Sequence, residues 1–178
     1  MTHIMAPVDV SRVTNLLGAL SVAVVDRVSE TTRVSAGHGA TAPAALATLL
    51  NSEGISVGEL ARVLRLSHAG TVRLVDRLVA DGLVSRHRGS DGREVSLRLE
   101  AHGRRTARAV LAARATVLEE ALAALGPNDS RAFERVAGHL LTALTSDVDV
   151  ADHICRLCDD RACPSRTCPV EAAVATQR

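Results

Sequence analysis

The spacing of apolar residues predicts helices over most of the chain. In three long segments apolar side chains recur every three or four residues, which is the period of an amphipathic helix. These segments are residues 8–34, 104–126 and 128–148, and a shorter helix is expected at 42–51. The stretch at 37–39, Gly-His-Gly, ends the first segment. Pro127 separates the last two, and Asn128 or Asp129 is available to cap the helix that follows.

Two further helices with cap patterns lie in the middle of the chain. Ser56 and Glu59 form the Ser-x-x-Glu pattern of a capping box, in which the two residues satisfy each other's backbone N–H groups at a helix start. This helix is expected to reach about Leu64. A second helix begins after Ser67 and stops at Gly82, a residue suited to the left-handed conformation past a helix end. Two helices joined by a short turn predict a helix-turn-helix.

After the second helix, the pattern of apolar residues along the chain changes from helical to alternating. The residues that carry the change are Val84, His87, Val95, Leu97 and Leu99. Residues 89–92, Gly-Ser-Asp-Gly, supply a turn, so we expect two short strands that form a wing. The predicted fold is therefore mainly α with a small β-hairpin, an α+β winged helix-turn-helix. Its apolar stripe is expected to form the domain core rather than a cofactor site: Leu60, Val63, Leu64, Leu74, Val75, Leu78 and Leu83.

The composition fits a helical scaffold with an aliphatic core. Apolar residues make up 47% of the 178 residues, they are almost all Ala, Val and Leu, and Phe133 is the only aromatic residue. No apolar run approaches the roughly 20 residues that a membrane span needs. The N-terminus lacks a basic region followed by an apolar stretch. We therefore expect a cytoplasmic protein without a membrane partner.

The positive charge is concentrated in one part of the chain. The sequence contains no lysine, and its formal net charge of +1 suggests no particular partner. Between Arg62 and Arg108, however, there are eleven arginines and only five acidic residues, a local excess of six positive charges. A basic segment that overlaps a helix-turn-helix and its wing indicates binding to nucleic acid.

A set of short motifs in this segment resembles a known family. In order they are R-L-V-D-R-L at 73–78, D-G-L-V-S-R at 81–86, D-G-R-E-V at 91–95 and L-x-L-E-x-H-G at 97–103. With helices on both sides, the set is similar to the multiple antibiotic resistance regulator (MarR) family of bacterial winged helix-turn-helix repressors. The resemblance covers about residues 8–146. It departs at Gly70, in the first turn of the recognition helix, where small hydroxyl residues are common in relatives.

The resemblance implies a homodimer whose terminal helices interleave. It divides the chain into an N-terminal dimerisation helix (1–35), a winged helix-turn-helix domain (36–104), C-terminal dimerisation helices (105–148) and a cysteine-rich tail (149–178). The apolar residues expected at the dimer interface are Leu16, Leu20, Val24, Leu111, Leu118 and Leu122.

The polar and basic residues of the winged helix are predicted to make two kinds of contact with double-stranded DNA, to base edges and to phosphates. A helix fits the major groove, and the side chains of its first turns reach base edges. The expected contacts there are Ser67, His68, Thr71 and Arg73, with Arg77 four residues further on the same face. In the wing we expect Arg86 and Arg88 to contact phosphates. Asp91 is placed to hold Arg93, which by the resemblance is presented to the minor groove.

All four cysteines lie within 14 residues of the tail. Cys155, Cys158, Cys163 and Cys168 follow the spacing C-x2-C-x4-C-x4-C, which is that of a zinc knuckle with cysteine in place of the usual histidine. Structural disulfides are not expected for a cytoplasmic chain. The spacing suits one tetrahedral zinc ion. Cys168 followed by Pro169 is also similar to the Cys-Pro ending of bacterial ferredoxin motifs, so an iron-sulfur cluster is the main alternative, and reversibly oxidised thiols the third.

Two classes of function follow from these patterns. The first is a dimeric DNA-binding regulator, in particular a repressor, whose affinity is tuned by a small-molecule effector, a metal or a redox change. The second is a metal-thiolate enzyme or redox carrier that uses the helix-turn-helix as a scaffold. The sequence offers no general acid-base pair, nucleophile-base pair or phosphate loop, so we expect no enzyme.

Overall fold

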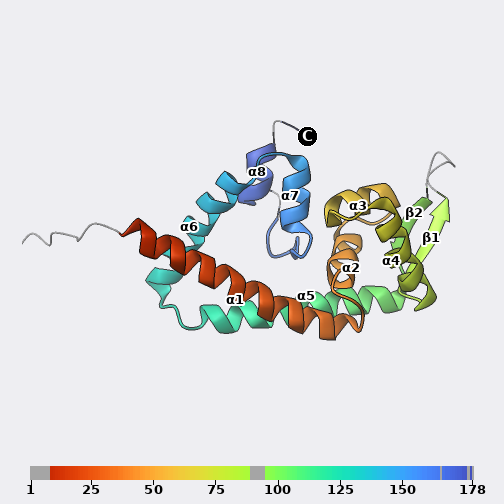
Figure 1. Ribbon diagram of the computed structural model, residues 1–178, viewed down its shortest axis with the longest axis horizontal. Coiled ribbons are helices and arrows are strands. Elements are labelled where there is room, and N and C mark those ends of the chain that lie inside the picture. Colours follow the sequence, from red (N-terminus) through yellow and green to blue (C-terminus); the bar gives the residue numbers. More distant parts are fainter. Residues whose placement is uncertain (1–8, 89–94, 165, 176, 178) are drawn as a thin grey trace, which may run out of the picture.

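The computed structural model describes residues 9–88, 95–164, 166–175 and 177. These residues form eight helices and one antiparallel hairpin, as Figure 1 shows. In chain order the elements are α1 (Val10–Ala36), α2 (Ala42–Asn51), α3 (Val57–Leu64), α4 (His68–Ala80), β1 (Val84–Arg88), β2 (Val95–Leu99), α5 (Ala101–Leu122), α6 (Pro127–Leu144), α7 (Val148–Cys155) and α8 (Pro169–Val174). The expected fold class, mainly helical with a small hairpin, is confirmed.

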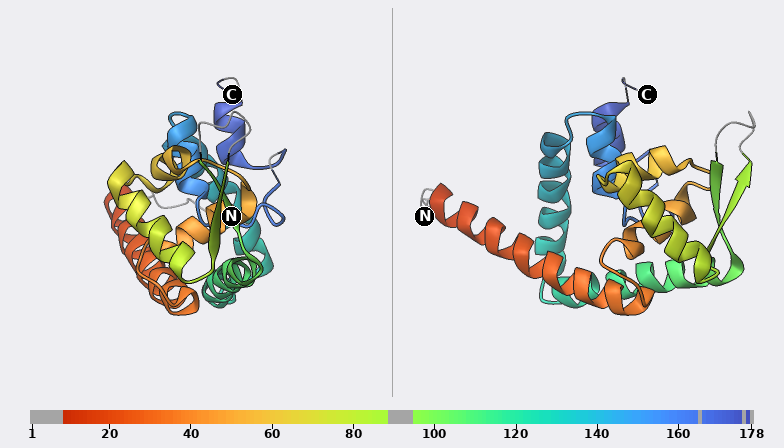
Figure 2. Two further views of the ribbon diagram at one scale, coloured as in Figure 1. Left: turned by 90° about the vertical axis from the view of Figure 1, so that its right-hand side faces the viewer. Right: turned by 45° about the vertical axis from the view of Figure 1, so that its right-hand side comes forward.

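Two long helices, α1 and α5, form the base of the molecule. They pack side by side, while the first half of α1 projects away from the rest of the chain (Figure 2). Asp9 caps α1 by accepting hydrogen bonds from two backbone N–H groups, and Gly37 ends it in the left-handed conformation with φ 66°. Only the second half of α1 has buried residues, which are Val28, Thr32 and Ala36.

A compact lobe of α2, α3, α4 and the hairpin stands on one end of α5. Nearly every side chain of α2 is buried, and the apolar faces of α3 and α4 close over it. All seven residues that the sequence predicted for this core are buried: Leu60, Val63, Leu64, Leu74, Val75, Leu78 and Leu83. The hairpin is joined to the start of α3, because Leu97 N–H donates to the Ile55 carbonyl at 2.9 Å and Ser56 pairs with Ser96.

The cap patterns read from the sequence fix the helix-turn-helix as expected. The Ser56 hydroxyl accepts from Glu59 N–H at 3.1 Å, and the Glu59 carboxylate accepts from Ser56 N–H at 2.7 Å, which completes the capping box. The hydrogen bond from Ser56 N–H favours the charged carboxylate, so the pKa of Glu59 is lowered. Gly82 ends α4 with φ 66°.

Gly103 allows α5 to approach the lobe closely. It lies in the first turn of α5, against the backbone of Leu83 at the start of the hairpin. A Cβ atom at this position would overlap the Leu83 carbonyl oxygen, which also accepts a hydrogen bond from Glu100 N–H at 2.9 Å. The long helix is therefore seated on the winged-helix lobe by backbone contact.

The C-terminal part of the chain differs from the sequence-based expectation. Pro127 is the first residue of α6 and Gly126 is its N-cap, so Asn128 and Asp129 are not the cap. Helix α6 ends at Leu144 rather than near residue 148, and the tail contains two further helices, α7 and α8. Leu111, expected at a dimer interface, is buried within its own chain at 5% exposure and is not available to a partner.

No helix in the described part of the chain is long and apolar enough to cross a membrane.

Candidate functional site

Helix α4 presents two arginines and a histidine on its outer face. Its inner face is anchored in the core by Leu74, Val75 and Leu78, so the phase of the helix is fixed. His68 lies in its first turn, and Arg73 and Arg77 lie on its exposed side. This arrangement confirms that the helix turns these three side chains toward solvent, where a ligand can reach them.

Two other residues predicted at this surface have local roles. Ser67 is exposed and is the N-cap of α4, since its hydroxyl accepts from Gly70 N–H at 3.1 Å. Thr71, in contrast, is fully buried, and its hydroxyl donates to the Ser67 carbonyl at 3.1 Å. The prediction that Thr71 contacts a base is therefore wrong, because this side chain faces the core.

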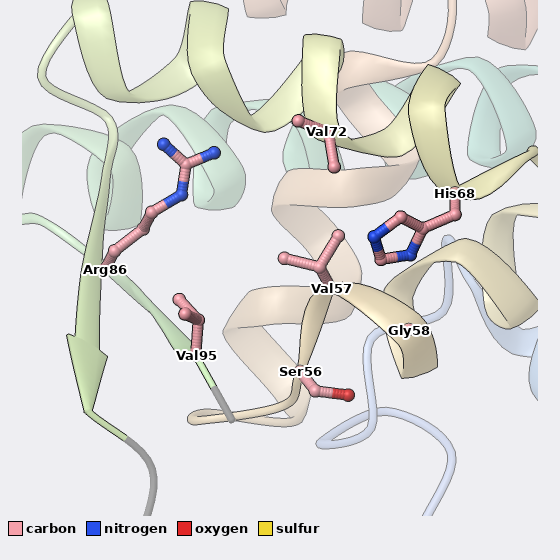
Figure 3. A pocket seen from close by; sticks show the side chains of 7 residues that line it. All are labelled: Ser56, Val57, Gly58, His68, Val72, Arg86 and Val95. Atoms are coloured by element: carbon pink, nitrogen blue, oxygen red, sulfur yellow. The ribbon is translucent and has the colours of Figure 1, made fainter. Parts of the chain in front are cut away.

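A hollow lies between the recognition helix and the wing. Its volume is about 410 Å³, and Figure 3 shows side chains from the start of α3, from α4 and from both strands around it. The lining residues are Ser56, Val57, Gly58, His68, Val72, Arg86 and Val95. Sequence reasoning did not find this hollow, because it assigned Val57 and Val72 no role and gave Val95 only a place in the strand pattern.

The wing is tied to the recognition helix by an ion pair. Arg86 Nη2 lies 2.7 Å from the Asp76 carboxylate, and Arg86 also lines the hollow. Arg86 thus holds β1 against α4 in addition to any contact with phosphate. Arg88 is exposed at the end of β1. Asp91 and Arg93, the predicted contacts at the tip of the wing, lie outside the described residues.

The four tail cysteines gather as two pairs of thiols. The thiols of Cys155 and Cys158 shift each other's pKa, and the Cys168 thiol raises the pKa of Cys163. The two pairs lie within electrostatic range of each other, because Cys168 raises the pKa of Cys155 and Cys158 raises that of Cys163. Cys168 is buried, Cys155 and Cys158 are partly buried, and Cys163 is exposed.

The pairs carry thiols of different acidity. The interaction with the Cys155 thiol lowers the pKa of Cys158 to about 7, and the positive charges of Arg114 and Arg156 act in the same direction. The same interaction, together with burial, raises the pKa of Cys155. Burial and the Cys168 thiol raise the pKa of Cys163 to about 11. Within the described residues, no three histidine, cysteine or acidic side chains converge around one point suited to a metal ion.

His153, which lies two residues before the first cysteine, points elsewhere. Its Nδ1 lies 2.8 Å from the Val63 carbonyl oxygen of α3, and burial lowers its pKa. It therefore joins α7 to the helix-turn-helix and is not turned toward the thiols.

A helix-turn-helix followed by a two-stranded wing, with exposed arginines on its second helix, defines a winged helix-turn-helix DNA-binding protein. The sequence model of the MarR family matches residues 39–94, which include α2, α3, α4 and β1 and end just before β2. Over this segment the chain is similar to the MarR family, and the fold that it shares with a solved MarR family protein extends over 77% of the chain.

Solved structures from several bacteria share the fold. A MarR family protein from Bacillus stearothermophilus is 28% identical, with a TM-score of 0.69 over 77% of this chain and 96% of its own. Rv1404 from Mycobacterium tuberculosis is 26% identical, with a TM-score of 0.64 over 76% and 94% of the two chains. No curated protein matches the sequence.

These matches indicate the general activity. The chain is a DNA-binding transcription regulator, and MarR family proteins are regulators rather than enzymes. The first of the two function classes that the sequence left open is therefore confirmed in its coarse form.

Proposed function

We propose that the chain represses transcription as a homodimer bound to a pseudo-palindromic operator, with an affinity set by a small ligand, metal or redox signal. The observation that carries the proposal is one exposed recognition surface per chain, with α4 and the wing joined by the Asp76–Arg86 pair. A single recognition helix reads only a few base pairs, so two copies are needed to specify an operator.

Exposed apolar stripes on α1 and α6 support the dimer. On α6 the stripe consists of Phe133, Val136, Leu140 and Leu144, all at least 40% exposed. On α1 it consists of Val10, Val13, Leu17 and Leu20, all at least 46% exposed. Stripes of this size are uncommon on monomers, and burial against a second copy removes them from water.

Footprinting tests the arrangement on DNA. On duplexes selected from a random library, we expect protection of two half-sites whose centres lie about 10 base pairs, or one helical turn, apart. Protection of one asymmetric half-site by a monomer would contradict the dimer. In a purified transcription assay, placing this operator over a promoter should lower transcript yield, and an increase would contradict repression.

Arg73 is expected to read a base, whereas Arg88 is expected to contact phosphate. Replacing Arg73 with alanine should weaken binding to the selected operator by about 1 to 3 kcal/mol and change binding to random duplexes little. Replacing Arg88 should weaken both and reduce the slope of log affinity against log salt by about one. Titrations by fluorescence anisotropy at several salt concentrations measure both effects.

The matched control for these variants is Arg131→Ala. Arg131 lies in α6, and Figure 1 shows this helix on the opposite side of the molecule from α4 and the wing, so its loss should leave affinity for both duplexes unchanged. Equal losses on operator and random DNA for Arg73→Ala would show that this residue reads no base.

A further inference from the structure

Within one chain, helix α6 is held in place mainly by the C-terminal tail. It follows α5 after a short link at residues 123–126, and Figure 1 shows it leaving the far end of that helix. Among the described residues α6 packs on α8, whereas α1, α5 and the lobe make at most sparse contacts with it. The direction of α6, which carries one of the exposed apolar stripes, therefore depends on α8.

A buried apolar cluster joins α6 to both helices of the tail. Its buried members on α7 and α8 include Ala151, Val170 and Val174. Leu141 of α6 packs against this cluster. Because these side chains leave water only where the three helices meet, α6, α7 and α8 pack as one unit.

The other side of α7 is docked on α3. Arg62 Nη1 of α3 lies 2.8 Å from the Asp149 carboxylate and 3.8 Å from that of Asp152. His153 Nδ1 donates to the Val63 carbonyl oxygen at 2.8 Å. This carbonyl lies in the last turn of α3 and has no donor within the helix, so the histidine satisfies a helix end of the lobe.

The residues that follow α7 are docked on the lobe as well. Leu157 packs against the apolar core that α2, α3 and α4 share. Asn51 of α2 donates through Nδ2 to the Cys158 carbonyl at 2.9 Å and to the Asp160 carboxylate at 3.1 Å. The tail thus has an apolar and a polar attachment to the lobe, and α7 and α8 lie between α6 and α3 in Figures 1 and 2.

We propose that α7, residues 156–164 and α8 form a brace that fixes the angle between α6 and the DNA-binding lobe. Asp149, His153 and Leu157 are its positioning residues on the side of the lobe. In the proposed dimer α6 contacts the partner, so the brace sets the distance between the two recognition helices. This effect on DNA rests on the proposed function, whereas the brace within one chain does not.

A variant that changes only tail residues loosens the brace and leaves the lobe intact. It combines Asp149→Arg, His153→Ala and Leu157→Asp. The new arginine meets Arg62, the alanine removes the hydrogen bond to α3, and the aspartate would have to be buried against the core. Three changes are combined because a single solvent-exposed ion pair contributes little.

Distance measurements without DNA test the brace itself. Spin labels are attached through unnatural amino acids at Arg77 of α4 and Arg131 of α6, both exposed, in full-length chains diluted with unlabelled protein. The wild-type chain should give one narrow distance, and the loosened variant a distribution about twice as broad or more. Equally narrow distributions would overturn the brace. Arg161→Ala is the matched control, because it removes only the ion pair with Asp159 inside the tail and should keep the wild-type width.

Binding to operators of different half-site spacing tests the effect on DNA. Duplexes carry two half-sites with centres about 9 to 12 base pairs apart, and a further duplex carries one half-site. The loosened variant should lose about fivefold or more of its affinity for the spacing that the wild type prefers. Its affinities for the other spacings should differ less from one another, and its affinity for the single half-site should be unchanged.

Two results of this titration would overturn the positioning role. One is an unchanged preference among spacings. The other is an equal loss on the single half-site, which would show that the substitutions damage the lobe. Failure of both proteins to bind any two-site duplex would instead count against the proposed function, while the distance distributions would still decide the brace.

A charge reversal tests the contact between α7 and α3 specifically. Asp149→Arg alone should reproduce part of the loss at the preferred spacing, because two guanidinium groups then meet. Adding Arg62→Asp places opposite charges together again and should restore the spacing preference. A double variant that behaved like Asp149→Arg alone would show that this pair does not dock the brace.

Discussion

Replacing Gly103 with alanine is expected to lower the free energy of unfolding by about 3 kcal/mol, at the upper end of the usual range for overpacking. The added methyl group would overlap the Leu83 carbonyl oxygen, which is backbone and cannot rotate away. The first turn of α5 must therefore shift from the lobe, and the hydrogen bond from Glu100 N–H to Leu83 is strained with it. For a chain of this size the melting temperature should fall by about 6 to 12 °C.

The matched control is Gly138→Ala in the interior of α6. Nothing lies within 4 Å of a Cβ atom built there, so the substitution adds helix propensity without a clash. Its effect should be neutral or stabilising by up to about 1 kcal/mol. Denaturant unfolding followed by circular dichroism measures both variants. Equal stability of Gly103→Ala and the wild-type protein would contradict the close packing of α5 on the lobe.

The double variant Leu17→Glu and Leu140→Glu is expected to be monomeric. These residues are 46% and 40% exposed within their own chain, so glutamate at both positions disturbs little of the monomer's packing. In a dimer the charges would be buried on the apolar stripes of α1 and α6, which is strongly unfavourable. Light scattering after size exclusion should report half the wild-type mass. Affinity for a two-site operator should fall by about a hundredfold or more, because the two recognition helices no longer act together.

Arg135→Glu controls for added negative charge on α6. Helical spacing of 100° per residue places Arg135 on the side opposite the stripe that contains Leu140. This variant should remain dimeric. A double variant that also kept the wild-type mass would show that the two stripes do not form the dimer interface.

The sequence predicts the winged-helix lobe well because local rules agree there. The capping box at Ser56, the cap at Ser67 and the left-handed Gly82 each mark a helix boundary that the structure has. Within these boundaries the apolar periodicity places one set of side chains on the inner faces of the helices, so the core residues could be predicted. Thr71 is the exception, because it was assigned to the DNA surface from its place in the first turn of α4. Its spacing of three and four residues from Leu74 and Val75 places it on the buried face instead.

The tail could not be predicted to the same degree. Helix α7 has eight residues and α8 has six, and periodicity is uninformative over such short lengths. In retrospect Asp147 and Pro169 are the available signs, since one caps α7 and the other begins α8. The contacts of Asn51 with Cys158 and of His153 with Val63 depend on how distant segments meet, which no local pattern encodes.

The junction between the wing and α5 leaves no room for a hinge. Only Glu100 separates β2 from α5, and Gly103 seats the first turn on Leu83, so the lobe and the long helix move as one rod. A helix of 22 residues is about 33 Å long, and a tilt of about 5° at its far end displaces the other end by about 3 Å. In the proposed dimer, a small change in the angle between the two subunits would therefore change the distance between the two recognition helices by an amount comparable to the rise of one base pair.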